Sequence, residues 1–412
     1  MKLLYLNPTG LFGGAERVLL DLIASIRERR PHWTILLIAG SDGPLIRRAR
    51  NMGIAAEVLP IPQSLAEIGD AGAGVPARAQ VGRLTLAASL ARAGFSTIMY
   101  KNLLGRRIRE IAPTLIHTNG FKMHIMAAAS VGCKIPVIWH VHDYVSKRPV
   151  MRRLMRFEAA HCAAAIANSN TVRNDLISTC AGQFEVATVY NAVDLDQFRE
   201  SGPLLDLDKL SGLPPAQLGV VRVGIVGTLA RWKGHEVFLR AIAALPPESP
   251  VRAYVVGDAI YSTRGSQWSL DELRTRAKWL GLSDKVGFAG FVEDVPAAIR
   301  ALDIVVHAST EPEPFGLVIA EAMACGKAII AARAGGAEEI VNASGGAIFH
   351  RPGDYADLAN CIGRLVRNPA GRARFRETGR AAAERLFART RLSSEVIPVY
   401  ERVVSAKYNG RI

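Results

Sequence analysis

Short apolar runs alternate with helix-like segments along the whole chain. In the first half, KLLYLN and TILLIAG are each followed by a stretch with helical periodicity, and the alternation starts again at VRVGIVGTL, Val221–Leu229. Alternating strand and helix patterns build parallel sheets that are covered by helices. The sequence therefore predicts an α/β fold of two doubly wound, Rossmann-like domains that face each other across a cleft.

A connector containing proline and glycine, SGPLLDLDKLSGLPPAQLG, separates the two alternating regions. We expect a first domain over residues 1–189 and a second domain over residues 190–388, with residues 389–412 returning to the first domain. In open parallel sheets, ligands bind beyond the carboxyl ends of the strands. The ligand is accordingly expected in the cleft between the domains.

Composition supports two folded domains. The 412 residues are 49% hydrophobic and 21% charged, which is typical of globular proteins. Because no apolar run reaches the roughly 18 residues needed to cross a bilayer, we expect a cytoplasmic protein. The five cysteines lie far apart and form no CxxC pair, so the sequence predicts buried thiols and neither a disulfide framework nor a zinc site.

The formal net charge is +14, and two basic clusters, Lys101–Arg109 and Ser146–Arg156, lie in the first half. Apolar residues interleave with them at near-helical spacing: Leu103, Leu104, Ile108, Val150, Leu154 and Met155. Such segments can rest on an anionic membrane surface, here at the inner membrane face; the alternative is an ordinary solvated helix face. Nucleic acid is not an expected partner, because no aromatic residues interleave with the basic runs.

The segment Leu302–Ile330 has the pattern strand, loop, helix, strand. Residues 314–316 lie where the helix would begin, so its amides and positive dipole end would attract an anion such as a diphosphate. Glu313 precedes that helix and Glu321 lies within it. Their carboxylates could accept hydrogen bonds from the hydroxyls of a sugar and of a ribose. The alternative is a cap and a surface position, but Glu321 has apolar neighbours, among which an unpaired carboxylate would be costly.

Two cations follow the first strand of the second half. Arg231 and Lys233 in GTLARWKGHEVF stand just ahead of a helix-like stretch. At the carboxyl end of a strand they would face the ligand and neutralise a leaving diphosphate. A solvated loop is the alternative interpretation.

The first half contributes glycines and histidines at similar places. Gly13 and Gly14 precede a helix-like stretch and permit close backbone approach to a ligand, but they lack the spacing of a dinucleotide fingerprint, which disfavours a nicotinamide enzyme. His117, His140 and His142 lie at the ends of strand-like runs. Each alone could be structural, whereas together they are candidates for contact with a ligand.

These motifs resemble family 4 of the retaining glycosyltransferases, which have the GT-B fold. The resemblance is strong in the second half, through EPEPFGLVIAEAMACGKAII, GTLARWKG and YNAVDLDQF, and looser in the first, through GGAE, HTN and WHVHD. It implies transfer of a sugar from a nucleotide-diphosphate sugar to a saccharide or lipid-linked acceptor, with retention of configuration and without a metal or cofactor. Cell-surface polysaccharide or glycolipid biosynthesis is the implied pathway.

The resemblance also implies roles for charged residues of the second half. By position, Glu313 contacts the hydroxyls of the donor sugar, Glu321 binds the ribose, and Arg231 and Lys233 grip the diphosphate. Family members often have arginine directly after the glycine that ends the first strand, whereas this chain has Thr228. The role of that arginine is therefore carried over to Arg231.

Backbone groups and the first half complete the implied site. Phe315, Gly316 and Leu317 would offer amides near the sugar and diphosphate, Gly14 would approach the diphosphate from the first domain, and His142 would lie beside the transferred sugar. A nucleotide-sugar epimerase on the same fold is the alternative function. It would need acid and base groups at C2 of the sugar and no second substrate.

Overall fold

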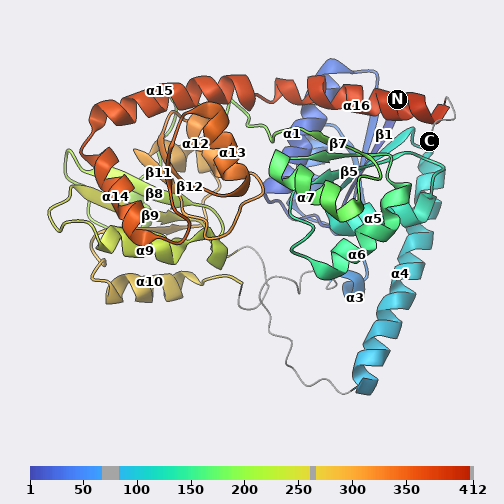
Figure 1. The fold of residues 1–412 in the computed structure, drawn as a ribbon, viewed down its shortest axis with the longest axis horizontal. Coiled ribbons are helices and arrows are strands. Elements are labelled where there is room, and N and C mark those ends of the chain that lie inside the picture. The colour runs from blue at the N-terminus through green and yellow to red at the C-terminus, as the bar shows by residue number, and fades with distance from the viewer. Residues whose placement is uncertain (67–82, 260–265, 409–412) are drawn as a thin grey trace. The chain divides into compact units, whose positions relative to one another are not determined.

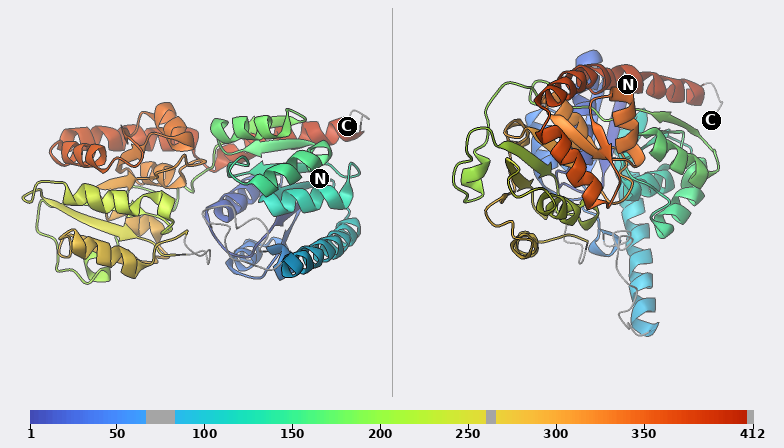
Figure 2. Two further views of the ribbon diagram at one scale, coloured as in Figure 1. Left: turned by 60° about the horizontal axis from the view of Figure 1, so that its bottom comes forward. Right: turned by 60° about the vertical axis from the view of Figure 1, so that its left-hand side comes forward.

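The computed structural model describes residues 1–66, 83–259 and 266–408, which form two compact units (Figure 1). Unit 1 consists of Met1–Asn191 and Arg389–Ile412, and unit 2 of Ala192–Ala388. The chain thus returns to its first unit through the C-terminal helix α16, Thr390–Tyr408. Both units consist of a parallel sheet with helices on both faces (Figure 2), which confirms the predicted fold class.

Unit 1 has the strand order β3-β2-β1-β4-β5-β6-β7 among its described residues. Its strands are β1 (Lys2–Asn7), β2 (Thr34–Ala39), β3 (Ala55–Val58), β4 (Leu115–Asn119), β5 (Val137–Val141), β6 (Ala164–Ala167) and β7 (Glu185–Thr188). Its helices, besides α16, are α1 (Gly14–Arg29), α2 (Pro44–Asn51), α3 (Gln63–Ala66), α4 (Arg83–Ile111), α5 (Phe121–Val131), α6 (Pro149–Glu158), η2 (Ala159–His161) and α7 (Asn170–Cys180).

The two faces of this sheet pack against different helices. Side chains from α4 to α7 cover one face, where Trp139 of β5 and Leu104 of α4 are fully buried. Helices α1 and α16 pack together, and the Ser393 amide donates to the Ser25 hydroxyl at 3.1 Å. Because side chains alternate along a strand, His140 points to the face opposite Trp139.

Unit 2 has the strand order β10-β9-β8-β11-β12-β13 among its described residues. Its strands are β8 (Val221–Val226), β9 (Val251–Val256), β10 (Val286–Gly290), β11 (Ile304–His307), β12 (Ala328–Ala332) and β13 (Ile348–His350). Its helices are α8 (Leu207–Leu210), η3 (Arg231–Lys233), α9 (His235–Ala243), α10 (Leu270–Trp279), α11 (Val295–Arg300), α12 (Leu317–Ala324), α13 (Gly335–Ser344), α14 (Tyr355–Val366) and α15 (Pro369–Leu386).

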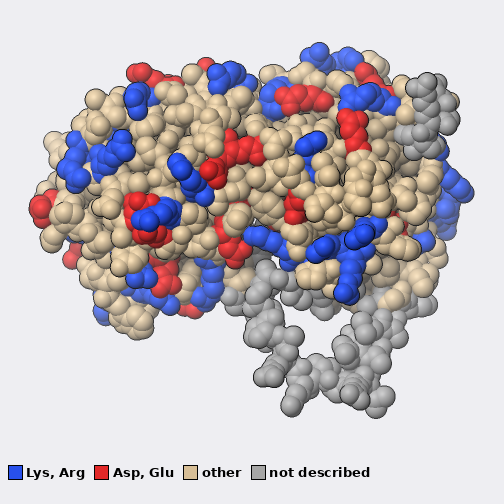
Figure 3. Space-filling model, in the orientation of Figure 1, with Lys and Arg blue, Asp and Glu red and all other residues tan. Residues whose placement is uncertain are grey.

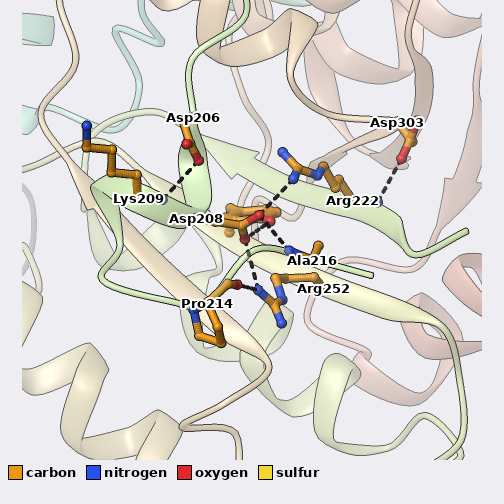
Figure 4. A network of polar contacts seen from close by, with 9 residues as sticks. Asp206, Asp208, Lys209, Pro214, Ala216, Arg222, Arg252 and Asp303 are labelled. Carbon is orange, nitrogen blue, oxygen red and sulfur yellow. Dashed lines mark hydrogen bonds and ion pairs between the residues drawn. The ribbon is translucent and has the colours of Figure 1, made fainter. Parts of the chain in front are cut away.

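An ion network attaches the short helix α8 to the sheet of unit 2 (Figure 4). The buried Asp208 carboxylate accepts hydrogen bonds from Arg222 at 2.7 Å, from Arg252 at 3.0 Å and from the Tyr254 hydroxyl at 2.7 Å. Arg222 and Arg252 come from neighbouring strands, β8 and β9. The segment that leads into unit 2 is therefore fixed at the amino ends of these strands, opposite their carboxyl ends.

Two expectations are wrong in part. Cys133, just beyond the end of α5, is exposed and Cys361 is only partly buried, whereas Cys162, Cys180 and Cys325 are buried as predicted. Three of the apolar residues in the basic clusters face the core of unit 1 and cannot contact a membrane: Leu104, Ile108 and Met155.

The other three apolar residues of these clusters are exposed: Leu103 at 47%, Val150 at 58% and Leu154 at 39%. Among the described residues, no helix combines the length and apolar character required to span a membrane.

Candidate active site

A pocket lies at the carboxyl ends of β8 and β11 in unit 2. These strands are neighbours in the sheet, and the strand order reverses between them, since β9 and β10 extend from β8 while β12 and β13 extend from β11. Connections that diverge at such a point leave space for a ligand. The residues lining the pocket include Gly227, Thr228, Lys233, His307, Ser309 and Val318.

Glu313 is the centre of a compact polar cluster beside this pocket. The Lys233 ammonium donates to its Oε1 at 2.5 Å, and the Ser309 hydroxyl donates to its Oε2 at 2.8 Å. His307 Nε2 lies 2.6 Å from the same Oε2. The structure therefore brings together Lys233 and Glu313, both singled out from the sequence.

The proton on His307 can be assigned from its two neighbours. Its Nδ1 accepts the Ala332 amide at 3.4 Å, and a neutral imidazole carries its proton on only one nitrogen. Nε2 is then the protonated atom, and it donates to the Glu313 carboxylate. His307 thus holds the carboxylate from the end of β11 without requiring a positive charge of its own.

Opposing effects set the pKa of Glu313. Burial raises the pKa of this carboxyl, but the electrostatic effects of Lys233 and His307 and the hydrogen bonds from both side chains lower it more. The net effect holds the pKa of Glu313 well below its usual value. The side chain is therefore a carboxylate at neutral pH, and its charge is offset by Lys233.

Helix α12 begins beside this cluster. Gly316 is its N-cap residue, and the helix runs from Leu317 to Ala324. Amides of a first helical turn have no carbonyl one turn earlier, and together with the helix dipole they favour an anion. Val318 of this first turn lines the pocket, so the amino end of α12 and the Lys233 ammonium offer positive charge to the same hollow.

Close backbone approaches hold the two loops of the site. A Cβ atom on Gly336 would lie 2.2 Å from the Pro314 carbonyl oxygen, and one on Gly234 would lie 1.9 Å from the Ala308 carbonyl oxygen. The Gly336 amide also donates to the Glu313 carbonyl at 2.7 Å. Only glycine fits at these two positions, which fix the loops that carry Glu313 and Lys233.

Phe315, just before α12, and Glu321, within α12, are both buried. The Phe315 ring packs edge-on against Phe387, with ring centroids 6.0 Å apart, so its side chain is part of the core and only its backbone is left for a ligand. Glu321 is 5% exposed within α12. This burial excludes the alternative of a surface position for Glu321.

Arg231 is placed apart from the Glu313 cluster. Its guanidinium stacks over the Trp268 ring at 3.7 Å from the centroid and pairs with Glu272 at 3.2 Å. Residues 231–233 form a single 3-10 turn, so the side chains of Arg231 and Lys233 leave this turn in different directions. Lys233 points to Glu313, while Arg231 points to the start of α10.

The candidates in unit 1 lie at the carboxyl edge of its own sheet. Gly14 is the first residue of α1. His142 follows β5, and its ring lies 4.0 Å from that of His140, centroid to centroid. Burial lowers the pKa of His142 to about 4, so this ring is neutral at physiological pH.

Sequence reasoning missed three polar residues of the unit 2 pocket: His235, His307 and Ser309. His307 directly follows the apolar run IVV in the sequence, and Ser309 stands two residues further on. The argument applied to the first-half histidines, that polar residues at strand ends face a ligand, would have found both. His235 carried no such signal, because it stands at the start of a helix.

Two doubly wound domains, with a helix amino end at the carboxyl ends of the strands in unit 2, are typical of the GT-B fold. The sequence profile of the glycosyl transferases group 1 matches residues 218–382, and that of Glycosyltransferase Family 4 matches residues 12–197. The chain belongs to the family 4 glycosyltransferases, which confirms the predicted resemblance.

Individual relatives agree with this family. HepE from Anabaena, solved in complex with UDP-glucose, superimposes with a TM-score of 0.75 and 28% identity over 98% of this chain and 100% of that chain. D-inositol 3-phosphate glycosyltransferase 2 of Catenulispora acidiphila is 34% identical over 250 residues, which are 58% of this chain and 56% of the relative. The D-inositol 3-phosphate glycosyltransferase of Corynebacterium jeikeium is 31% identical over 54% of each chain. The matches thus span about half the length of these two curated relatives.

Proposed function

We propose that this protein transfers a sugar from a nucleotide-diphosphate sugar to a hydroxyl-bearing acceptor, with retention of configuration. The observation that carries the proposal is the joint placement of Lys233, Glu313 and the amino end of α12 at one pocket. A diphosphate there would find an ammonium group and helix amides. A sugar ring would find a carboxylate that is already ionised.

Bond breaking at the sugar places negative charge on the leaving diphosphate. Lys233 and the first-turn amides of α12 supply fixed positive charge at that point, which is the effect that stabilises such a transition state most strongly. Glu321 is proposed to hold the ribose and Glu313 the sugar hydroxyls. In this mechanism cations of the protein take the place of a divalent metal, and no cofactor takes part.

UDP-glucose is the first donor to test, because HepE, 28% identical over nearly the whole chain, was solved with it. The purified chain would be screened with UDP-, GDP- and ADP-sugars by thermal shift in the presence of a chelator, and then assayed for transfer to sugar, cyclitol and lipid-linked acceptors. Stabilisation by one donor class and formation of a product with the donor's anomeric configuration are expected. Loss of binding in the chelator, or an inverted product, would contradict the mechanism.

An epimerase would use the same nucleotide-sugar pocket. It is distinguished by proton NMR of the donor incubated without an acceptor. Conversion to an isomer at C2, with neither hydrolysis nor transfer, would establish the epimerase and remove the transferase proposal. The acceptor and the pathway, for which we propose cell-surface polysaccharide or glycolipid synthesis, follow from the product.

Helix α6 is also proposed to contact an anionic membrane face, which would make this cytoplasmic enzyme peripheral to the membrane. Val150, Leu154 and Phe157 are exposed at one-turn spacing, Phe157 at 78%, and exposed arginines at 152, 153 and 156 flank them. Figure 3 shows Lys and Arg side chains gathered over the part of unit 1 where α6 lies. The basic cluster on α4 is less suitable, because Arg106 and Arg107 pair with Glu110.

Co-sedimentation with vesicles tests this contact. We expect binding to vesicles with anionic lipid that fades as salt rises, and loss of it in the Arg153→Glu, Arg156→Glu double variant. Arg106→Glu on α4 is the matched control and should bind as the unmodified protein does. Equal behaviour of neutral and anionic vesicles would show that α6 is an ordinary solvated face.

A further inference from the structure

A chain of four buried rings crosses unit 1 from helix α16 to the end of β5. The Tyr5 hydroxyl lies 3.3 Å from the Tyr400 hydroxyl, and the Tyr400 hydroxyl lies 2.6 Å from His117 Nδ1. His117 Nε2 in turn lies 3.2 Å from His140 Nδ1. All four side chains are at most 3% exposed, so the chain is shielded from solvent over its whole length.

The direction of the protons in this chain follows from elementary hydrogen-bond chemistry. A phenol hydroxyl is a better donor than a neutral imidazole N–H, and imidazole nitrogen is the better acceptor. Tyr400 therefore donates to His117 Nδ1, which leaves the proton of His117 on Nε2, and this proton is donated to His140 Nδ1. The reverse direction would leave the buried Tyr5 proton without an acceptor, at the cost of an unsatisfied donor.

His140 ends the chain with its proton on Nε2. Among the described residues, this atom has no hydrogen-bond partner, although His140 is only 3% exposed. Asn119 at the end of β4 is its partner in the sheet register, and the Oδ1 atom of Asn119 likewise has no hydrogen-bond partner within the described chain. Buried polar atoms are normally satisfied, so two orphaned atoms on adjacent strand ends indicate that something else supplies their hydrogen bonds.

The chemistry of the missing partner is restricted by charge. Burial lowers the pKa of His117 to about 3, and the pKa of His140 also lies well below its usual value, chiefly because of burial. Both rings are neutral at physiological pH. They offer hydrogen bonds but no net charge, which suits the oxygen of an uncharged hydroxyl group.

We propose that Tyr400 is a positioning residue that holds His117, and through it His140, in the tautomer that presents an Nε2–H donor to a hydroxyl oxygen of a carbohydrate-like ligand. The identification of this ligand as the acceptor or the transferred sugar rests on the proposed transferase function, whereas the hydrogen-bond chain does not. Helix α16 returns from the far end of the sequence, and by this proposal its Tyr400 completes the site in unit 1.

Ring nitrogen NMR of the full chain, labelled with 15N in its histidines, tests the proposal directly. In the unmodified protein His117 and His140 should both be Nε2–H tautomers at neutral pH. Tyr400→Phe removes the donor at the head of the chain and should give His117 and His140 a mixture of tautomers. Tyr5→Phe is the matched control: it removes a buried hydroxyl next to Tyr400 but leaves Tyr400 free to donate, so both tautomers should be unchanged.

Titration with D-glucose and myo-inositol supplies the ligand readout. At least one of these polyols should shift the His140 Nε2 signal in the unmodified protein, and Tyr400→Phe should weaken that affinity about two- to tenfold, which corresponds to one hydrogen bond. Tyr5→Phe should leave the affinity unchanged.

Three results would overturn the proposal. They are an Nδ1–H tautomer at His140 in the unmodified protein, histidine tautomers in Tyr400→Phe that equal those of the unmodified protein, or a His140 Nε2 signal that neither polyol shifts. The first needs no variant, so it decides even if Tyr400→Phe does not fold. Failure of every donor in the transfer assay would instead remove the transferase function and leave the tautomer result standing.

Discussion

Glu313 accepts hydrogen bonds from side chains on two separate loops of unit 2. Lys233 comes from the turn after β8, and His307 and Ser309 come from the end of β11. A ligand that draws Lys233 towards a diphosphate leaves the carboxylate held by His307 and Ser309, and one oxygen becomes available for a sugar hydroxyl. At the scale of single residues, the carboxylate would therefore keep the hydrogen bonds from His307 and Ser309 when Lys233 changes partner.

Replacing Lys233 with alanine is expected to lower kcat/KM with the identified donor at least about a hundredfold, because a positive charge at the leaving group is lost. Arg231→Ala should cost less than Lys233→Ala, since Arg231 is held against Trp268 and Glu272. Steady-state kinetics and thermal unfolding would be measured on both. Lys278→Ala removes an exposed ammonium of α10 and serves as the control. A Lys233→Ala enzyme that is folded and turns over normally would refute the site.

Glu321→Gln tests the ribose contact with little change in volume. A carboxylate that accepts two hydroxyl protons binds more strongly than an amide, so we expect nucleoside diphosphate affinity to fall about tenfold or more, by calorimetry with UDP or the matching nucleotide. Glu321→Ala should lose most transfer activity. The exposed Glu377→Gln on α15 is the control. Equal nucleotide affinity in Glu321→Gln and the unmodified protein would place the ribose elsewhere.

At the scale of elements, the short helices depend on tertiary contacts for their position. Helix α12 has only eight residues, and its position depends on the close approach of Gly336 to the loop before it. Helix α8 has four residues and would not be stable alone. Its attachment to β8 and β9 through Asp208 is therefore a tertiary effect.

Asp208→Asn is expected to destabilise unit 2 by about 2–4 kcal/mol, because it removes the charge that Arg222 and Arg252 share; the lower end allows for the partial exposure of Arg222. Urea unfolding followed by hydrogen exchange of β8 and β9 would measure the change. Asp206→Asn, two residues earlier, keeps an N-cap side chain for α8 and should be nearly neutral. If both variants are equally stable, the network of Figure 4 contributes little.

At the scale of the whole molecule, unit 1 repeats the order of the six strands of unit 2 and adds β7, but the two units differ in the chemistry at their strand ends. In each sheet the second and third strands in sequence lie on one side of the first strand, β1 or β8, and the later strands lie on its other side. The edge of unit 2 carries ions, Lys233 and Glu313, whereas the edge of unit 1 carries the neutral rings of His117 and His140. This difference fits a charged donor in unit 2 and an uncharged hydroxyl ligand in unit 1, as proposed above.

The buried histidines should make unit 1 sensitive to acid. Burial lowers the pKa of His117 to about 3 and of His142 to about 4, so the unfolded chain takes up protons near pH 6.5 while the folded unit does not. Stability therefore falls as pH drops below about 6.5, by at most about 1.4 kcal/mol per pH unit for each histidine. The part of this loss of stability that is due to His142 ends once the pH falls below about 4, because the folded protein then also protonates this ring.

Urea titrations at several pH values, read by hydrogen exchange of β4 and β5, would show this slope. His142→Asn should reduce this slope by the contribution of one proton. An unchanged slope in His142→Asn would mean that this ring is protonated equally in both states.

Local pattern was sufficient for much of this protein. Apolar periodicity determined the alternating strands and helices of both units, because buried parallel strands require near-continuous apolar runs such as AIIAA. The motif around Glu313 and Glu321 identified the family, because a helix start between two carboxylates is a local feature of the chain.

The partners of each side chain were decided by tertiary structure alone. Hydrogen bonds join Glu313 to Lys233, 80 residues away, and His117 to Tyr400, 283 residues away. No periodicity encodes such a separation. Arg231 and Lys233 look equivalent in the sequence, yet one 3-10 turn directs them to different neighbours. Sequence thus determined which residues could carry the chemistry, and packing decided which of them meet, because a side chain's direction depends on the backbone around it.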